Sequence, residues 1–409
     1  MRKSALYALG LVVAALVALG LVILSSASEV RGARFYHDSF FFVKRQFLYL
    51  GAGIVVATVL ALFDYRKWRD YWGLSVLFAS VVFVALLAVF LFPEIKGSHR
   101  WIVLGPLSFQ PGEFAKIAVV VMVAVWLDLA AWRVELFWRG ALWPVVLIGM
   151  MAGPVALEPD FGSVMVIASV GFLLMFVAGT RILHMAPLFL CGLVVVGVMI
   201  YNNPNRRARI AKYVGAVMAE RVEDAQGDEV QSGAQDASGA KTAAAVRAKG
   251  KPKGETVYQS EMSLVAIGRG GLFGVGLMRS MQKQNYLPEA WTDFIFAVGA
   301  EELGLVFSVG VILLFSAFFF LSVYIAQKAA DRFGRLLVVG MSFIIFFQAT
   351  FNLGVVCEAF PTKGMALPFF SYGGTNMLSS FFAVGVILSV GIHSLKDQKR
   401  TFTRKVLAN

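Results

Sequence analysis

Charged residues are scarce in this chain: Asp, Glu, Lys and Arg make up only 15% of its 409 residues. Soluble domains carry about a quarter of charged residues, so this composition excludes an ordinary soluble enzyme. Hydrophobic residues account for 58%, and the mean hydropathy is +0.74. Several unbroken apolar runs approach or exceed the roughly 18–20 residues that cross a bilayer. The sequence therefore predicts an all-α, polytopic membrane protein.

Cysteine and histidine are also scarce. The two cysteines, Cys191 and Cys357, lie in apolar sequence and form neither a disulfide framework nor a zinc-binding spacing. We expect both to be small buried hydrophobic residues. The four histidines are scattered along the chain, which argues against histidine-based catalysis. The sequence contains no Walker loop and no Ser/His/Asp arrangement.

The net charge of +12 would suit a nucleic-acid partner. The basic residues form no stripe, however, and occupy short loops between apolar runs, which is typical of membrane topology. No nucleic-acid partner is therefore predicted. The first apolar run reaches about 20 residues without a compelling cleavage site, which favours a retained helix over a signal peptide. We predict about ten spans, near 5–25, 46–64, 73–92, 112–131, 141–157, 162–178, 182–201, 294–325, 335–357 and 371–392. The eighth is long enough to be tilted or to protrude from the membrane.

The distribution of lysine and arginine predicts the orientation. Loops on one side and the C-terminal tail are richer in these residues than the short loops on the other side, so both termini are predicted to be cytoplasmic. The segment 202–292, between the seventh and eighth spans, becomes a large extracytoplasmic loop of one membrane domain, 1–409. Its middle, 222–255, contains no aromatic residue and cannot bury a core, so we expect a disordered insertion there.

One stretch, YLPEAWTDFIFAVGAEELG at 286–304, carries carboxylates into an apolar run. Glu289 and Asp293 lie at its mouth, and Glu301 and Glu302 lie deeper. Carboxylates at membrane depth are costly, so they indicate a functional site. If the segment is helical, the four-residue spacing puts Glu289 and Asp293 on one face. A carboxylate pair half out of water suits a general base.

A second polar cluster lies in SHRWIVLGPLSFQPGEFAK, 98–116, where Gln110 opens a helix. Lys116 lies well inside that span and requires a carboxylate or an anion, for which Glu113 is the evident partner. Arg100 either contributes to a site or extends to the membrane interface. At the next junction, Asp160 either caps the following helix or helps to hold a ligand.

Glycine is concentrated in the segment 267–283, where five glycines fall within nine residues, at positions 268, 270, 271, 274 and 276. They predict backbone that bends or closely approaches another group. The segment does not follow a strand of a βαβ unit, which excludes a dinucleotide loop. Its polar residues could bind pyrophosphate, or else lipid headgroups; they are Arg269, Arg279, Gln282 and Lys283.

The last polar segment is PTKGMALPFFSYGGTN, 361–376, whose prolines and glycines forbid a regular helix. Non-helical backbone at membrane depth is tolerated only where it is buried or lines a cavity. We therefore predict a broken or re-entrant segment near the outer face. The side chains expected to face its cavity are Lys363, Ser371, Tyr372 and Thr375.

Together these motifs resemble the SEDS family (shape, elongation, division and sporulation proteins), over residues 5–395 but without 222–255. Its division-type members are more similar than its elongation-type members. Several motifs in the same order make the resemblance specific. The matching strings are RWIVLGPLSFQPGEFAK, EPDFGS, GRGGLFGVGL, QKQNYLPEAWTDFIFA and PTKGMALPFFSYGGT.

The resemblance implies a peptidoglycan glycosyltransferase that polymerises lipid II into glycan strands and releases undecaprenyl pyrophosphate. It further implies a class B penicillin-binding transpeptidase and other divisome proteins as partners, at the division septum of the bacterial inner membrane. Asp293 matches the family's essential aspartate. The family's other polar cavity positions match Arg100, Lys116, Glu289, Lys363 and Ser371, with Gln110 and Tyr372 in the same motifs.

Two positions depart from the family pattern. Trp291 stands where a histidine usually precedes the Thr-Asp pair, and Gly112 stands where a serine is usual. Asp293 itself is intact, so we do not expect an inactive member. The missing histidine argues against a mechanism that needs one beside the base.

The residues fit the implied chemistry. Inverting transfer requires a base for the acceptor hydroxyl and positive charge for the departing pyrophosphate. Asp293 would supply the first and Arg100, Lys116 and Lys363 the second; the sequence leaves open whether Mg²⁺ or Mn²⁺ takes part. The alternatives are a lipid II flippase, an elongation-type polymerase and a catalytically idle scaffold. A flippase needs polar groups reachable from both faces, whereas these clusters are all predicted on the outer one.

Overall fold

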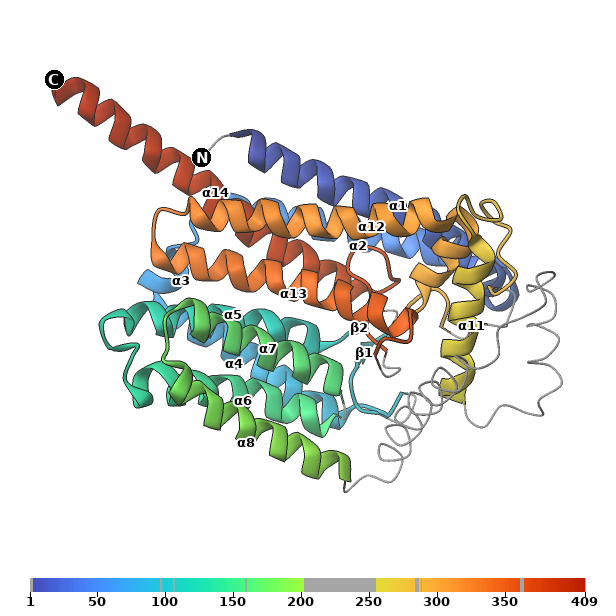
Figure 1. The fold of residues 1–409 in the computed structure, drawn as a ribbon, viewed down its shortest axis with the longest axis horizontal. Helices are drawn as coiled ribbons and strands as arrows, with labels where there is room; N and C mark the ends of the chain where they lie inside the picture. The colour runs from blue at the N-terminus through green and yellow to red at the C-terminus, as the bar shows by residue number, and fades with distance from the viewer. Residues whose placement is uncertain are drawn as a thin grey trace, which may run out of the picture.

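The computed structural model describes residues 3–95, 98–105, 107–158, 160–201, 255–283, 287, 289–360 and 364–408. The long helices run side by side along one axis (Figure 1). Both chain ends lie at one end of this bundle, the terminal end. The hairpin of β1 (Ile102–Leu104) and β2 (Leu107–Phe109) and the helix α11 (Glu255–Gly270) lie at the opposite, hairpin end. Lys363 and nearly all of the predicted insertion 222–255 lie outside the described residues.

Each predicted span coincides with an apolar helix. These helices are α1 (Lys3–Tyr36), α2 (Phe41–Leu62), α4 (Trp72–Ala88), α5 (Pro111–Leu129), α6 (Trp143–Leu157), α7 (Phe161–Val177), α8 (Ile182–Tyr201), α12 (Ile295–Gln327), α13 (Arg332–Val356) and α14 (Gly374–Ala408). Short elements between them are α3 (Lys67–Asp70), two 3₁₀ turns (Val89–Leu91 and Ala131–Arg133) and a π-helix (Phe137–Leu142).

Within the described residues, seven helices are long and apolar enough to cross a membrane: α1, α2, α4 with its 3₁₀ turn, α6 with the π-helix, α12, α13 and α14. α7 and the apolar stretch Ile182–Val195 of α8 are shorter. α5 has the length of a span and carries Glu113, Lys116 and Asp128. The all-α, polytopic membrane architecture is therefore confirmed, with the small hairpin as its one added sheet in the part of the chain described.

α5 forms the buried centre of the bundle. It packs against α4, α6, α7, α13 and α14, and its run of valines and alanines is buried almost without interruption. The outer faces of α2 and α4 instead expose large apolar side chains such as Leu48, Val55 and Leu77. Such faces match the hydrocarbon of a bilayer, where they need no protein cover.

The predicted long span at 294–325 is broken. Gly304 adopts φ +71° and ψ −160°, which splits α12 into a stub, 295–303, and a longer helix. The glycine segment after α11 satisfies the backbone groups released by the break. Glu301 O accepts from Val275 N (3.0 Å), Glu302 O accepts from Gly276 N (3.0 Å), and Leu305 N donates to Gly271 O (2.9 Å). A break at membrane depth is tolerated because its backbone groups are paired in this way.

The prediction that both cysteines are buried is wrong. Cys191, on α8, and Cys357, at the end of α13, are free thiols on the protein surface. Apolar sequence around a cysteine implies burial only in a soluble protein. In a membrane protein the same sequence also suits a lipid-facing position.

Candidate active site

The segment 289–294 is a turn that precedes α12, so Glu289 and Asp293 do not share a helical face as their spacing suggested. Glu289 has a positive φ of +57°. Its carboxylate accepts a hydrogen bond from Thr292 Oγ1 (Oε2, 3.1 Å). The side chains of Glu289 and Asp293 therefore extend from a compact turn at the mouth of α12, the Asp293 turn.

Three successive carbonyls of the Asp293 turn are held from outside it. Trp291 O accepts from Tyr372 N (3.0 Å), and Thr292 O accepts from Ser371 Oγ (2.6 Å). Asp293 O accepts from Asn352 Nδ2 (2.8 Å), which also donates to Met365 O (2.7 Å). Because α13 and the 364–373 segment supply these donors, the backbone of the catalytic candidate is fixed by three separate contacts.

This arrangement revises the expected roles of Ser371 and Tyr372. The Ser371 hydroxyl also accepts from Leu367 N (2.7 Å), and the residue is almost fully buried. It therefore fixes backbone rather than facing a cavity. Tyr372 packs its ring edge-on against Phe42 (5.0 Å between centroids). The Arg45 side chain of α2 lies close enough to the Tyr372 hydroxyl to interact with it.

Trp291 has a packing role. It occupies the position at which a histidine is usual in the SEDS family pattern. The Arg31 guanidinium lies 4.1 Å from the centre of its ring, within the range of a cation–π contact. On α2, Phe42 stacks against it at 6.3 Å. The indole thus ties α1 and α2 to the Asp293 turn and brings a cation there, without any acid–base function.

Because Gly364 has no side chain, it leaves space for the carboxylate of Asp293. A Cβ at position 364 would be 2.5 Å from Asp293 Oδ2, a distance at which one of the two must move. Gly364 is exposed and Asp293 is half-buried. The Asp293 carboxylate therefore reaches the accessible edge of the 364–373 segment, directly after the undescribed Lys363.

Lys116 has the partner predicted for it. Its Nζ lies 2.7 Å from Glu113 Oε1, both residues are buried, and Ser379 of α14 donates to Glu113 Oε2 (3.1 Å). Gln110 lies nearby in the chain, and its backbone N–H donates to Thr375 Oγ1 at the start of α14 (3.1 Å). These contacts join α5 to α14. They place the Lys116 charge in the bundle core, where it is paired with Glu113.

Arg100 and Asp160 belong to a third cluster, at the α6–α7 junction. Arg100 Nε donates to the Glu158 carbonyl (3.2 Å). Asp160 caps α7, which is one of the two roles expected for it, since its carboxylate accepts from Ser163 N (3.4 Å) and Ser163 Oγ (2.7 Å). Burial, and then repulsion from Asp160, raises the pKa of Glu158 to about 8, although Arg100 opposes the shift.

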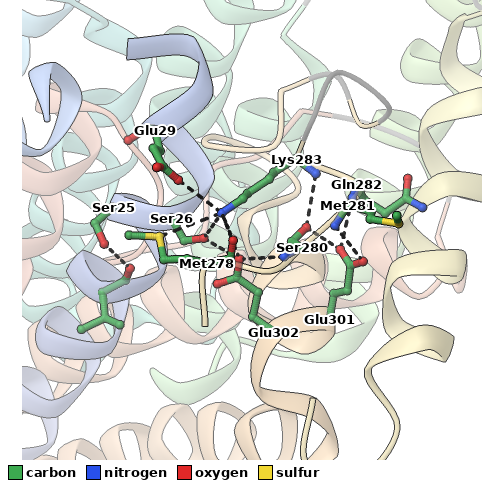
Figure 2. A network of polar contacts seen from close by, with 12 residues as sticks. Ser25, Ser26, Glu29, Met278, Ser280, Met281, Gln282, Lys283, Glu301 and Glu302 are labelled. Atoms are coloured by element: carbon green, nitrogen blue, oxygen red, sulfur yellow. Dashed lines mark hydrogen bonds and ion pairs between the residues drawn. The ribbon is translucent and has the colours of Figure 1, made fainter. Parts of the chain in front are cut away.

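Two of the three basic residues of the glycine-rich segment, Arg269 and Lys283, are paired with carboxylates of α12. Lys283 Nζ lies 3.4 Å from Glu302 Oε1, and Arg269 Nη1 lies 3.2 Å from Glu301 Oε1. Figure 2 shows Lys283 pointing to Glu302 and to Ser26 and Glu29 of α1. The close backbone approach predicted by the glycines is confirmed: a Cβ at Gly270 would collide with Ala300 O and one at Gly274 with Glu302 O.

Several residues with contacts in this region were not among the candidates that the sequence motifs indicated. Asn352, near the end of α13, and Ser26, in the second half of α1, are buried polar side chains in apolar helices, and such side chains require a partner. That signal was available for both. In the sequence, Arg31 and Arg45 lie between the first two predicted spans, where basic residues bear only on membrane topology, and nothing connects them with Trp291 and Tyr372.

Comparisons with known proteins agree with this architecture. The profile of a cell cycle protein family, FtsW/RodA/SpoVE, matches residues 7–233 and 241–396. A probable peptidoglycan glycosyltransferase FtsW from Trichlorobacter lovleyi is 35% identical over 387 residues, 93% of this chain and 91% of that protein. Stage V sporulation protein E from Bacillus subtilis is 34% identical, over 93% of this chain and 94% of its own length.

Two solved structures share the fold. A chain of a peptidoglycan synthase complex that coordinates polymerization and crosslinking matches with a TM-score of 0.69 and 26% identity, over 95% of this chain and 98% of that one. The rod shape determining protein RodA of Thermus thermophilus matches with a TM-score of 0.65 and 25% identity, over 95% and 97%. With a family profile over nearly its whole length and this shared fold, the chain belongs to the FtsW/RodA/SpoVE family of membrane-embedded cell cycle proteins.

Proposed function

We propose that this protein is a peptidoglycan glycosyltransferase that polymerises lipid II during cell division, with Asp293 as its general base. The observation that carries the proposal is the Asp293 turn: α13 and the 364–373 segment hold its backbone, and the carboxylate reaches the exposed Gly364. A base must be held in register with the hydroxyl that it deprotonates. The FtsW relatives support both the activity and the division role.

In the proposed reaction, the acceptor hydroxyl attacks the anomeric carbon of the donor strand while Asp293 takes its proton. The bond from that carbon to the undecaprenyl pyrophosphate oxygen breaks, with inversion. Positive charge must stabilise the departing pyrophosphate. Lys363 and Arg100 are candidates for this positive charge. Two further candidates are Arg31, which lies against Trp291, and Arg45, which lies against Tyr372. Lys116 is engaged by Glu113, so we assign it to the fold.

A divalent cation has no evident ligand set here. Within the described ranges, no three His, Cys, Asp or Glu side chains come close enough together to hold one ion. A Mg²⁺ or Mn²⁺ ion at the Asp293 turn would therefore draw most of its ligands from substrate phosphate and water. Proton removal by Asp293 requires no step through such an ion.

The partner and the location follow from the same proposal. We infer a class B penicillin-binding transpeptidase as partner, consistent with the similarity to a chain of a peptidoglycan synthase complex.

We further infer that the protein lies in the septal membrane, with the terminal end of its bundle in the cytoplasm. Among the described residues, those proposed for chemistry lie at the hairpin-end termini of α1, α2 and α12 or just before β1. At the terminal end, Arg66 is ion-paired with Asp331 and Asp397. A site at one end favours a polymerase over a flippase, which must open to both sides.

The test is glycan synthesis by the purified full-length protein with its transpeptidase partner, on fluorescent lipid II, resolved on a gel. Asp293→Asn preserves shape but removes the base, so the rate should fall on the order of 10²–10⁴-fold. Asp70→Asn, half-exposed at the terminal end, is the matched control and should be as active as the wild type. Full activity of Asp293→Asn would refute the base assignment and make Glu289 the next candidate. Wild-type protein that moves lipid II across vesicles but makes no glycan would favour a flippase.

A further inference from the structure

The position of Asp293 depends on the 295–303 stub. Asp293 lies two residues before the stub, and Gly304 separates the stub from the rest of α12. A rigid helix of two and a half turns transmits any shift of its inner end to the Asp293 turn. What holds Glu301 and Glu302 at that inner end therefore also sets where the carboxylate of Asp293 lies.

The two glutamates are held differently. Glu301 accepts from the Ser280 hydroxyl and from the backbone N–H groups of Met281 (3.2 Å) and Gln282 (3.4 Å). Arg269 adds a fourth donor but is 39% exposed. Glu301 thus keeps several donors if Arg269 is lost.

Glu302 depends on a single cation, Lys283, far more than Glu301 depends on Arg269. It is fully buried, and its Oε1 atom accepts from Ser26 Oγ (2.5 Å) and Ser280 N (3.2 Å). Among the described residues its Oε2 atom has no hydrogen-bond partner. The ammonium of Lys283, 3.4 Å from Oε1, is the positive charge paired with it. A buried carboxylate that loses such a partner destabilises its surroundings strongly.

Lys283 also joins three separate parts of the chain. Its Nζ donates to Ser26 Oγ of α1 (2.9 Å) and to Met278 O (2.9 Å), and lies 3.5 Å from Glu29 Oε2. In Figure 2 the side chain extends between α1 and the stub, with its ammonium at the centre of these groups. With its side chain only 2% exposed, Lys283 is sealed between these elements.

From this geometry we propose that Lys283 is a positioning residue for glycan polymerisation: it fixes the stub, and with it Asp293, against α1. The proposal rests on the assignment of Asp293 as base. The side-chain contacts of Lys283 are with Ser26, Glu29, Met278 and Glu302 and not with Asp293, so it acts through Glu302 and Ser26. Its loss should lower kcat while the KM for lipid II changes little, because the binding groups at the hairpin end stay in place.

The test uses Lys283→Met, Lys283→Met with Glu302→Gln, and Arg269→Met as the control from the same cluster. Lys283→Met leaves Glu302 uncompensated and should lower the Tm. The double variant removes both charges and should recover Tm. Its kcat should nevertheless stay low, on the order of 100-fold below wild type, because misplacement by about 1 Å can cost that much. Arg269→Met should keep a kcat near that of the wild type.

Hydrogen–deuterium exchange supplies a readout independent of activity. In the double variant, amides of 289–303 should exchange faster than in the wild type, while those of α5 stay unchanged. Recovery of both Tm and kcat in the double variant would show that Lys283 only neutralises the charge of Glu302. That result would overturn the proposal. An equal loss of kcat in Arg269→Met, or unaltered exchange over 289–303, would overturn it too. If Asp293→Asn proves fully active, the base assignment fails, while the exchange result still reports on Lys283.

Discussion

Gly364 lies so close to the Asp293 carboxylate that a larger residue at position 364 would displace it. We predict that Gly364→Ala lowers kcat on the order of 10–100-fold, because its Cβ, 2.5 Å from Oδ2, displaces the carboxylate from its position. The fold should survive, since Gly364 is exposed.

The same non-helical segment offers the matched control. A Cβ at Gly373 would lie 3.7 Å from Asn376 Cβ, an ordinary contact, so Gly373→Ala should keep its activity. Initial polymerisation rates of both variants at saturating lipid II make the comparison. Equal rates would show that the Asp293 carboxylate does not work from the position seen here.

Glu158 should give the protein a measurable pH dependence. Its pKa is raised from 4.5 to about 8 in the folded state, chiefly by burial. The folded state then binds more protons than the unfolded state between these values, so stability falls as pH rises. The contribution is complete below about pH 4.5 and is lost as pH rises through about 8. Thermal unfolding from pH 5 to 9 should show Tm decreasing more steeply in the wild type than in Glu158→Gln. Parallel curves would contradict the assignment.

At the scale of elements, α13 serves as the frame on which two irregular segments are fixed. Asn352 Nδ2 donates to carbonyls of both, Asp293 O and Met365 O. Asn352→Leu would leave these carbonyls without that donor, at a cost of about 1–3 kcal/mol for each buried group. We predict a lower Tm and a lower polymerisation rate.

Asn376 provides the contrast for that measurement. Its two side-chain polar atoms are buried without a hydrogen-bond partner among the described residues. Asn376→Leu breaks no such bond, so its Tm should be equal to or above that of the wild type. A Tm loss in Asn376→Leu as large as that in Asn352→Leu would mean that side-chain volume, not hydrogen bonding, decides both.

At the scale of the whole molecule, the orientation in the membrane can be tested by labelling. Both native cysteines are exposed, so they must first be replaced by serine. We predict that a membrane-impermeant maleimide labels Val103→Cys, on β1 at the hairpin end, in intact cells. Leu136→Cys, between α5 and α6 and 52% exposed, should react only after permeabilisation. The reverse pattern would invert the topology and place the Asp293 turn in the cytoplasm.

The sequence by itself determined the membrane class, the positions of the spans and the motifs of the site. These properties are local: apolar runs, clustered glycines and prolines, and carboxylates at the mouth of a span are all visible within about 20 residues, the length of one span. The pairing of Lys116 with Glu113 and the cap by Asp160 were predictable for the same reason, since each joins residues three apart.

Only the tertiary structure decided which distant residues meet. The contacts of Ser371 with Thr292, Asn352 with Asp293, and Lys283 with Ser26 join residues 79, 59 and 257 positions apart. No periodicity or spacing specifies such pairs, because they depend on how whole helices pack. The break at Gly304 is of the same kind: a glycine in an apolar helix is common, and only the glycine segment beside it, which binds the released backbone groups, makes the broken form stable.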